Sequence, residues 1–478
     1  MPSLWAHIAG SDDTLAIRLF RQYVSLPILF LLGAELVVLA SGLWVGVILV
    51  LDEPSQMTGS APMWFRSALY AITTALSFLA VGLYSVRSRT GAVGTLVRVI
   101  AGGAGGVLAS TLWFYIFPET FLGRGVLAAT AAISFLGICI TRFGFHKLVD
   151  ENLFKRRVLV LGAGQRVMSI LKLRRRSDQR GFVIVGYVPT MGDMITVDDD
   201  KLLVEQGSLL ELARTARVDE IVVAQDDRRQ EFPLQDLLDC RLEGIEVSDL
   251  LTFLERETGK VQLDVMNPSW FIFSDGFKRS EFGDVAKRGF DIVAALLLLI
   301  IFLPIMVFVY LAIKVTDGLA KPAFYSQRRV GLNGEVYVIR KFRSMSVDAE
   351  EEGKPQWANS NDSRVTKFGN FLRVTRCDEL PQLFNVLAGD MSFVGPRPER
   401  PEFVSHLNEV IPYYRERHSV KPGITGWAQL CYPYGSSEQD SMEKLKFDMY
   451  YVKNQSVLFD LAILLQTVEV VLWGKGAR

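Results

Sequence analysis

The sequence has few cysteines and histidines, the residues that form disulfides and bind zinc most often. Its 478 residues include four cysteines and four histidines. They are scattered, with no spacing typical of a zinc site and no paired framework, which argues against both a zinc centre and a disulfide-rich fold. Net charge is also absent, because Lys and Arg total 52 and Asp and Glu total 52. We therefore expect no nucleic-acid partner, and any electrostatic signal must be local.

Hydrophobic residues are abundant instead. They make up 50% of the chain, and the mean hydropathy of +0.24 is above what soluble globular proteins usually show. The first third contains four apolar stretches of roughly 20 or more residues, each long enough to cross about 30 Å of hydrocarbon as a helix. They are residues 24–51, 64–86, 94–117 and 121–143. Residues 1–150 are therefore expected to form four transmembrane helices.

The charges beside these stretches predict their orientation. Residues 52–63 contain no Lys or Arg, whereas Arg87 and Arg89 follow the second stretch and further basic residues follow the fourth. Cytoplasmic loops are rich in Lys and Arg, so we expect the N-terminus and the chain after residue 143 in the cytoplasm. Glu35 stands alone within the first stretch. It is either a functional charge or a residue that faces Ser, Thr or Gly on a neighbouring helix.

Residues 151–256 alternate between strand-like and helix-like patterns, beginning with "RRVLVLGAGQRVMSILKLRRR". This alternation predicts a Rossmann-like parallel α/β domain. Gly162 and Gly164 match the start of the dinucleotide-binding G-x-G-x-x-G, but Val167 replaces the third glycine and no acid closes the second strand. The incomplete fingerprint favours a structural or regulatory domain over a working dinucleotide site.

A fifth apolar segment, residues 289–313, is flanked by Lys287, Arg288 and Lys314. At about 1.5 Å per residue it is long enough to span a membrane, but basic residues at both ends do not specify a crossing. Pro304 near its centre removes a helix hydrogen bond. Two interpretations stay open, a kinked transmembrane helix and a helix-break-helix hairpin that enters and leaves the same leaflet.

Basic residues cluster after this segment, with seven of them against two acidic residues in 314–345. Such a cluster suits either anionic lipid or phosphate groups. In "YVIRKFRSM", strand alternation puts Lys341 and Arg343 on one face, which favours phosphate ligands. Arg328 is a further substrate-binding candidate in this cluster. Arg397, held between two prolines, is a rigid guanidinium that also suits a phosphate.

Two adjacent acids, Asp378 and Glu379, precede Pro381 and an apolar helical pattern. Pro381 suits a first helical turn, so the acids lie at a helix N-terminus, where the dipole favours negative charge. The predicted buried face of this helix consists of Leu380, Leu383, Phe384 and Leu387. Capping needs only one acid, whereas a nucleophilic carboxylate beside a Mg²⁺ ligand uses both.

The C-terminal part resembles a known family. The stretches "QRRVG", "KFRSM", "NDSRVTKFGNFLR", "DELPQLFNVLAGDMSFVGPRPERPEF", "VKPGITGWAQ" and "YYVKN" resemble motifs of the bacterial sugar transferase family of monotopic phosphoglycosyl transferases. The resemblance covers roughly residues 286–478. Together with the four helices and the Rossmann-like domain, the chain is similar to the large polyisoprenyl-phosphate hexose-1-phosphate transferases of exopolysaccharide or O-antigen synthesis.

This resemblance implies a two-step reaction. Asp378 attacks the β-phosphorus of a UDP-sugar, with a hexose such as glucose expected as the sugar, releases UMP and forms a sugar-phosphoryl-aspartate. Undecaprenyl phosphate then accepts the sugar phosphate. The resemblance also implies that Glu379 binds Mg²⁺ and that Lys341, Arg343 and Arg397 lie near the nucleotide diphosphate.

The resemblance further implies a multi-pass protein of the bacterial inner membrane. The family's catalytic helices rest on a re-entrant helix broken at a Ser-Pro pair, for which this chain has Leu303-Pro304. UDP-sugars are cytoplasmic, so the catalytic domain is expected on the cytoplasmic face of the lipid bilayer. The tail, residues 456–473, contains Asp460 and Glu469 and suits an interfacial helix. A homodimer is left open.

The expected organisation is four helices in 1–150, a Rossmann-like domain in 151–256, a linker in 257–285 and a catalytic domain in 286–478 with a re-entrant helix in 289–313. After Gln429, the stretch "LCYPYGSSEQDS" departs from many members. With the terminal "GKGAR", it is similar to the branch found with exosortase-associated exopolysaccharide clusters.

Two other functions compete with this one. The first is a membrane-anchored, NAD-dependent nucleotide-sugar dehydratase or epimerase, which needs a Tyr-x-x-x-Lys pair. One such spacing joins Tyr310 to Lys314, outside the Rossmann-like domain. The second is a non-enzymatic assembly or regulatory subunit, which would release no UMP.

Overall fold

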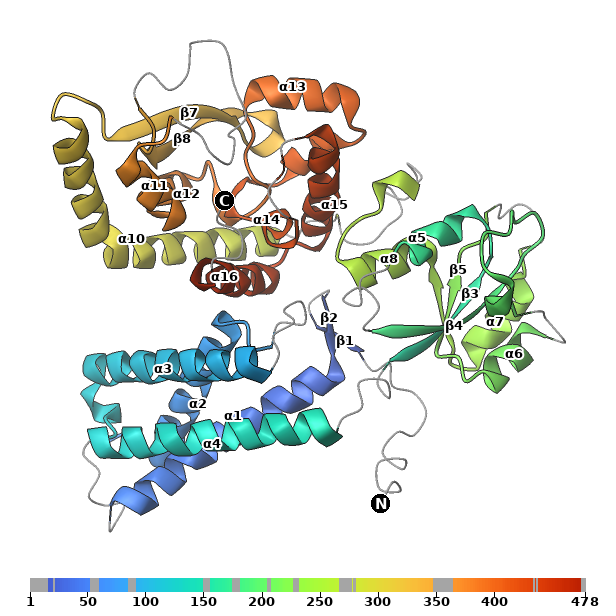
Figure 1. Cartoon of the computed structure of the whole chain (residues 1–478), viewed down its shortest axis with the longest axis horizontal. Helices are drawn as coiled ribbons and strands as arrows, with labels where there is room; N and C mark the ends of the chain where they lie inside the picture. The colour runs from blue at the N-terminus through green and yellow to red at the C-terminus, as the bar shows by residue number, and fades with distance from the viewer. Residues whose placement is uncertain are drawn as a thin grey trace. The chain divides into compact units, whose positions relative to one another are not determined.

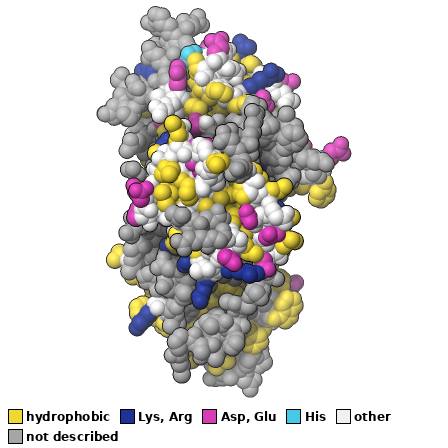
Figure 2. All heavy atoms as spheres, turned by 90° about the vertical axis from the view of Figure 1, so that its right-hand side faces the viewer, with side chains coloured by type: hydrophobic (Ala, Val, Ile, Leu, Met, Phe, Trp, Pro, Cys, Tyr) yellow, Lys and Arg dark blue, Asp and Glu magenta, His cyan; other side chains and the backbone are white. Residues whose placement is uncertain are grey.

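The computed structural model describes residues 16–19, 22–51, 60–84, 92–148, 155–173, 181–203, 208–226, 232–265, 277, 281–346, 364–432, 435 and 437–473. The chain forms two compact units, which we call the N-terminal unit (residues 1–265) and the C-terminal unit (residues 266–478). Their boundary falls inside the expected linker. Acidic, basic and hydrophobic side chains of the described residues are interspersed on the face shown in Figure 2.

Four helices follow a short hairpin of β1 (Ala16–Leu19) and β2 (Gln22–Ser25). They are α1 (Leu26–Val50), α2 (Met63–Ala80), α3 (Ala92–Ile116) and α4 (Arg124–Leu148). Helix α1 packs against α4 and α2, and α2 packs against α3. Among the described residues, α1, α3 and α4 are long and apolar enough to cross a membrane, whereas α2 has 18 residues with Arg66 inside and falls short.

Glu35 of α1 is fully buried and has a charged partner. Nε of Arg142 in α4 lies 2.8 Å from Glu35 Oε1, and the Tyr84 hydroxyl donates to the same carboxylate. The alternative that Glu35 faces Ser, Thr or Gly on a neighbouring helix was wrong, because a carboxylate removed from water needs a cation or strong hydrogen-bond donors. The ion pair joins α1 to α4, which supports a structural role for Glu35.

The second part of the N-terminal unit is a parallel sheet of order β4-β3-β5-β6. Its strands are β3 (Arg156–Leu161), β4 (Phe182–Val188), β5 (Glu220–Val223) and β6 (Glu246–Asp249). The helices between and after them are α5 (Met168–Leu171), α6 (Leu209–Thr215), α7 (Leu234–Leu242) and α8 (Leu250–Thr258). Val158, Leu159 and Val222 are fully buried, as expected for a parallel sheet covered on both faces. The predicted α/β alternation is present.

The C-terminal unit combines one long helix, α10 (Glu281–Asp317), with short strands and helices (Figure 1). These are β7 (Phe324–Val330), β8 (Val336–Phe342), α11 (Lys367–Val374), α12 (Gln382–Ala388), β9 (Ser392–Val394), α13 (Pro401–Val410), β10 (Gly423–Thr425), α14 (Trp427–Cys431), α15 (Glu438–Asn454) and α16 (Val457–Leu472). Strand β7 pairs antiparallel with β8, and β9 pairs parallel with β10.

Helix α10 is also long and apolar enough to cross a membrane, but it is not straight. Its ribbon turns sharply within the helix (Figure 1). Pro304 lies inside α10, and because proline has no N–H, the carbonyl of Ile300 loses its helical partner. The predicted break is therefore accompanied by a bend.

The basic residues at the start of α10 bind groups of the protein. Lys287 is buried in an ion pair with Asp460 of α16. Arg288 donates to the carbonyls of Val386 at 2.6 Å and Leu387 at 2.7 Å. This end of α10 therefore does not present the free positive flank that the sequence indicated. Asp460 and Glu469 are both buried, so the polar groups thought to favour an interfacial helix face the protein instead.

Candidate active site

The two adjacent acids lie on a short 3₁₀ turn directly before α12. Asp378 and Glu379 belong to η8 (Cys377–Glu379), which the chain enters through Arg376 with a left-handed φ of 59°. Pro381 follows with a φ of −63° and leads into α12. The predicted order of acids, proline and helix is therefore present.

The buried face of α12 differs from the predicted one. Phe384 is 44% exposed, whereas Gln382, Leu383, Asn385 and Val386 are buried. Asn385 explains the difference, because its Oδ1 accepts from the Arg340 N–H at 3.1 Å and its Nδ2 donates to the Val338 carbonyl at 2.8 Å. A polar side chain that pairs with the β8 main chain occupies the inner face, and Phe384 points outward.

Helix α10 contacts both ends of the segment that carries the acids. Cys377 and Leu380 pack in one core with Met306 and other residues that follow Pro304. Arg288, which precedes Pro304, binds the last carbonyls of α12. The parts of α10 before and after Pro304 thus contact opposite ends of the segment that carries the two acids.

Glu379 faces a pocket of about 270 Å³ with cationic walls. The lining residues are Arg329, Ile339, Lys341, Glu379, Gln382, Arg397, Pro398, Gly423 and Ile424. Lys341 Nζ lies 3.0 Å and Arg376 Nη1 3.8 Å from Glu379 Oε1. Asp378 beside it is only 7% exposed, and its Oδ1 has no hydrogen-bond partner among the described residues.

The two neighbouring carboxyl groups differ in acidity. Burial, reinforced by the negative charge of Glu379, raises the pKa of Asp378 to about 6. Burial also opposes ionisation of Glu379, but the positive charges of Lys341, Arg397 and Arg376 outweigh it and lower the pKa of Glu379 to about 2. Two acids whose environments separate their pKa values are suited to different roles.

The structure brings together some of the predicted phosphate ligands. Lys341 and Arg397 line the pocket. Arg343 is buried beyond the end of β8, where its N–H donates to the Ala323 carbonyl at 2.9 Å, and it does not line this pocket. Arg328 is exposed on β7 and does not line it either.

Arg329 and Gln382 line the pocket, although sequence reasoning did not select them. Arg329 pairs with Tyr337 across the hairpin. Since residues directly opposite in an antiparallel pair share a face, Arg329 lies on the same face as Lys341, four residues after Tyr337. The alternation in β7 was visible in the sequence, but the register that identifies Arg329 was not.

The glycine loop of the α/β region is occupied by the chain's own carboxylates. Asp226 accepts from the N–H groups of Gln165 and Arg166, both at 2.8 Å. Asp193 accepts from the Ala163 N–H at 2.9 Å. The N–H groups of such a loop bind the pyrophosphate in dinucleotide-binding folds. In this chain, those donors already have anionic partners.

The Tyr310 and Lys314 pair lies on α10, in the other unit from the glycine loop. Lys314 Nζ donates to the carbonyls of Leu319 at 2.9 Å and Lys321 at 2.7 Å. This lysine therefore holds the turn that follows α10, which gives the spacing a structural explanation.

Comparisons with known proteins point to the same part of the chain. A family model described as bacterial sugar transferase matches residues 282–474. A UDP-glucose:undecaprenyl-phosphate glucose-1-phosphate transferase of Xanthomonas campestris pv. campestris is 30% identical, over 87% of this chain and 88% of its own. A protein of the same name from Escherichia coli (strain K12) is 35% identical, over 69% of this chain and 70% of its own.

A shorter match has higher identity. A UDP-N-acetylgalactosamine-undecaprenyl-phosphate N-acetylgalactosaminephosphotransferase of Aeromonas hydrophila is 39% identical, over 50% of this chain and 55% of its own length. The similar proteins are thus named for different sugars.

Proposed function

Because the chain belongs to the bacterial sugar transferase family, we propose that it transfers a sugar 1-phosphate from a UDP-sugar to undecaprenyl phosphate. This would be the first membrane step of exopolysaccharide or O-antigen synthesis. A hexose such as glucose is favoured, because several relatives that match more than two thirds of the chain are named for glucose and another is named for galactose, which is also a hexose.

The observation that carries the proposal is the pair of adjacent acids with opposite pKa shifts beside a cationic pocket. In the first step, a carboxylate oxygen of Asp378 bonds to the β-phosphorus while the bond to the bridging oxygen breaks and UMP leaves. In the second step, a phosphate oxygen of undecaprenyl phosphate attacks the same phosphorus, and Asp378 leaves as a carboxylate. A carboxyl with a pKa of about 6 is mostly ionised at neutral pH, as a nucleophile must be.

The cations of the pocket suit the diphosphate. Lys341, Arg397 and Arg329 line one pocket, and guanidinium groups bind phosphate oxygens with two parallel hydrogen bonds. Fixed positive charge at the bridging oxygen would stabilise the negative charge that develops on departing UMP.

The acid pair also fits Mg²⁺. This ion binds through one or two carboxylates, with substrate phosphates and water completing its shell. Asp378 Oδ1 is buried without a partner among the described residues, next to the ionised Glu379. We assign Glu379 as the protein ligand, and the bound ion would neutralise charge on the diphosphate.

The proposal places the C-terminal unit on the cytoplasmic face of the bacterial inner membrane, with residues 289–313 entering and leaving on that side. The bend in α10 supports this arrangement, because a straight crossing would separate Asp378 from cytoplasmic UDP-sugar. Backbone groups freed by Pro304 would need partners from the protein at membrane depth.

A labelling experiment tests this topology. Leu319, just past α10, is 79% exposed, and unlike Gly318, with a φ of 102°, it tolerates a side chain. Leu319→Cys in a cysteine-free background should resist a membrane-impermeant thiol reagent on intact cells and react after lysis. Labelling from outside would mean that α10 crosses the membrane.

Release of UMP from a panel of UDP-sugars, with and without undecaprenyl phosphate, tests the function. We expect release that depends on the sugar, and repeated turnover that also depends on the lipid acceptor, because the first step alone releases one UMP for each enzyme. An assembly or regulatory subunit would release no UMP. Turnover that requires NAD would instead favour the dehydratase, which the occupied glycine loop argues against.

A further inference from the structure

The segment Pro396 to Glu399 carries Arg397 into the pocket, and its four main-chain carbonyl groups each accept a hydrogen bond. Pro396 and Pro398 have no N–H, so neither can be fixed by donating a hydrogen bond. The four successive carbonyls accept instead from the Gly423 N–H at 3.0 Å, Arg417 Nη2 at 2.9 Å, Arg329 Nη1 at 3.2 Å and the Val330 N–H at 3.0 Å.

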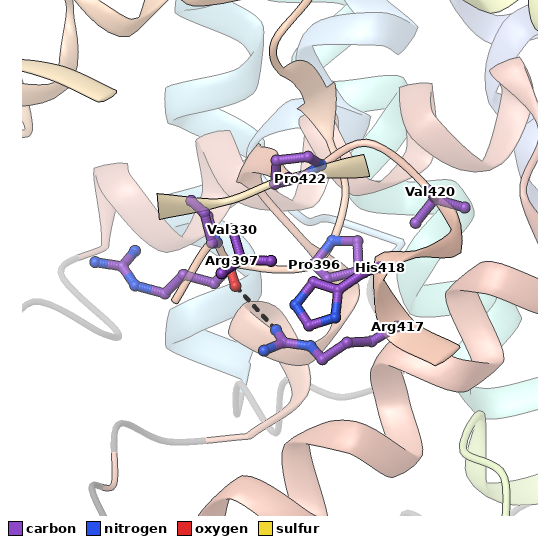
Figure 3. A pocket seen from close by; sticks show the side chains of 9 residues that line it. Val330, Pro396, Arg397, Arg417, His418, Val420 and Pro422 are labelled. Atoms are coloured by element: carbon purple, nitrogen blue, oxygen red, sulfur yellow. Dashed lines mark hydrogen bonds between the residues drawn. The ribbon is translucent and has the colours of Figure 1, made fainter. Parts of the chain in front are cut away.

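The donor to the Arg397 carbonyl is a buried guanidinium. Arg417 has a side chain 6% exposed and lies 2.8 Å from Asp448 of α15, whose side chain is 3% exposed. Its Nη1 also donates to the Tyr414 hydroxyl at 2.7 Å. Figure 3 shows the Arg397 side chain extending away while its carbonyl oxygen faces the Arg417 guanidinium.

His418, which follows Arg417 in the chain, does not supply a second cation. His418 is the adjacent cation candidate, but burial, reinforced by the charge of Arg417, lowers the pKa of His418 to about 4. The imidazole is therefore neutral at neutral pH. A planar guanidinium can bind Asp448, Tyr414 and a carbonyl at once, whereas a lysine ammonium on a flexible stem cannot match that geometry.

From these contacts we propose that Arg417 is a positioning residue, which fixes the main chain of Arg397 so that its guanidinium reaches the substrate diphosphate. Arg417 itself touches no substrate and acts through Arg397. The inference rests on the proposed function, because it assigns Arg397 to the diphosphate.

The test is a double-mutant cycle on the full-length protein in detergent. Arg417→Lys should lower kcat/KM for the UDP-sugar about tenfold or more, mainly through KM. Arg397→Ala should lower it further, and adding Arg417→Lys to Arg397→Ala should change it less than twofold. The milder Tyr414→Phe, which keeps the Asp448 ion pair, should lose about two- to fivefold in the native background and nothing with Arg397→Ala.

Arg256→Lys is the matched control. Arg256 is also a buried arginine with carboxylate partners, 2.5 Å from Glu220 and 3.0 Å from Glu257, but it lies in the N-terminal unit. It should lower the thermal midpoint without changing kcat/KM. An equal effect of Arg256→Lys on kcat/KM, or additive losses from Arg417→Lys and Arg397→Ala, would overturn the positioning role.

Binding of UDP by calorimetry separates this inference from the proposed function. Weaker UDP binding in both Arg397→Ala and Arg417→Lys supports the positioning role, even before the sugar is identified. Weaker binding in Arg397→Ala alone overturns that role and leaves the function standing. No UDP binding and no UMP release by the native protein would overturn both.

Discussion

Two regions of this protein, a glycine loop and a pocket, resemble anion-binding sites, and they differ in what their hydrogen-bond donors contact. The glycine loop of the α/β region donates its N–H groups to Asp193 and Asp226 of the same chain. The pocket of the C-terminal unit has Lys341, Arg329 and Arg397 in its walls. Asp378 does not line this pocket but precedes Glu379, which does, and one carboxylate oxygen of Asp378 lacks a partner among the described residues.

The two sites differ in the space beside their donors, because Lys341 and Arg329 also have partners in the chain but still line a pocket. In the glycine loop, a Cβ on Gly164 would lie 2.0 Å from Asp226 Oδ2, so the carboxylate fills the space a phosphate would need. The pocket lined by the cations and Glu379 has about 270 Å³ of space that is open to solvent. Of these two sites, we therefore expect only the pocket to bind a phosphate-containing ligand.

The largest expected effect is at Asp378. Asp378→Asn should lower UMP release, and exchange of labelled UMP into UDP-sugar without lipid, by at least about 10³-fold, because an amide is not a nucleophile. Asp390→Asn is the control, since Asp390 is an exposed acid at the other end of α12. Full exchange activity in Asp378→Asn would remove the covalent mechanism.

The next effect concerns the metal. Glu379→Gln should lower activity by about 10²-fold and remove its dependence on Mg²⁺, because the amide no longer supplies a charged ligand. Activity titrated against Mg²⁺ after chelator treatment measures both. A variant that keeps the Mg²⁺ dependence of the native protein would show that Glu379 is not the ligand.

The pH profile should follow Asp378. With a pKa of about 6, its ionised fraction, and with it kcat/KM, should fall about tenfold per unit well below pH 6. Lys341 lowers this pKa, so Lys341→Met should move the profile to higher pH besides slowing the reaction. A profile that stays in place on this change would assign the titration to another group.

The raised pKa of Asp378 also predicts an effect on folding stability, opposite in sign to that of a carboxylate in a salt bridge. The folded pKa of Asp378 lies above the ordinary value of 3.8, so the folded state binds more protons between about pH 4 and 6, and stability from this group falls as pH rises. Asp378→Asn should therefore raise the free energy of unfolding at pH 7.5 by on the order of 1–3 kcal/mol. The gain should vanish near pH 4, as thermal melts at the two pH values would reveal.

The smallest effect on activity is expected at the glycine loop. Native protein should show no micromolar binding of NAD, and Asp226→Ala should lower stability by about 1–2 kcal/mol through two orphaned N–H groups while changing UMP release less than twofold. Asp198→Ala is the control, because its side chain is 76% exposed. Tight NAD binding by the native protein would contradict the comparison between the glycine loop and the pocket.

Local patterns located most elements but not the partners of their side chains. The apolar stretch 94–117 corresponds to α3 (Ala92–Ile116), and the acids precede a proline and a helix as predicted. The predicted face of α12 was wrong at Phe384, because Asn385 binds the main chain of Arg340, 45 residues away. Helical periodicity describes only neighbours within one or two turns of the same helix. A short helix departs from the expected pattern when one polar residue on its inner face is hydrogen-bonded to another element.

By itself, the sequence determined the apolar helices, the α/β alternation and the acid pair before α12, because each depends on residues a few positions apart. Only the tertiary structure decided that Lys287 pairs with Asp460, 173 residues away, that Asp226 fills a glycine loop 61 residues before it, and that Arg329 rather than Arg328 lines the pocket. Hydrogen bonds and ion pairs form between groups a few ångströms apart in space, so their partners follow from packing and strand register, which no local pattern specifies.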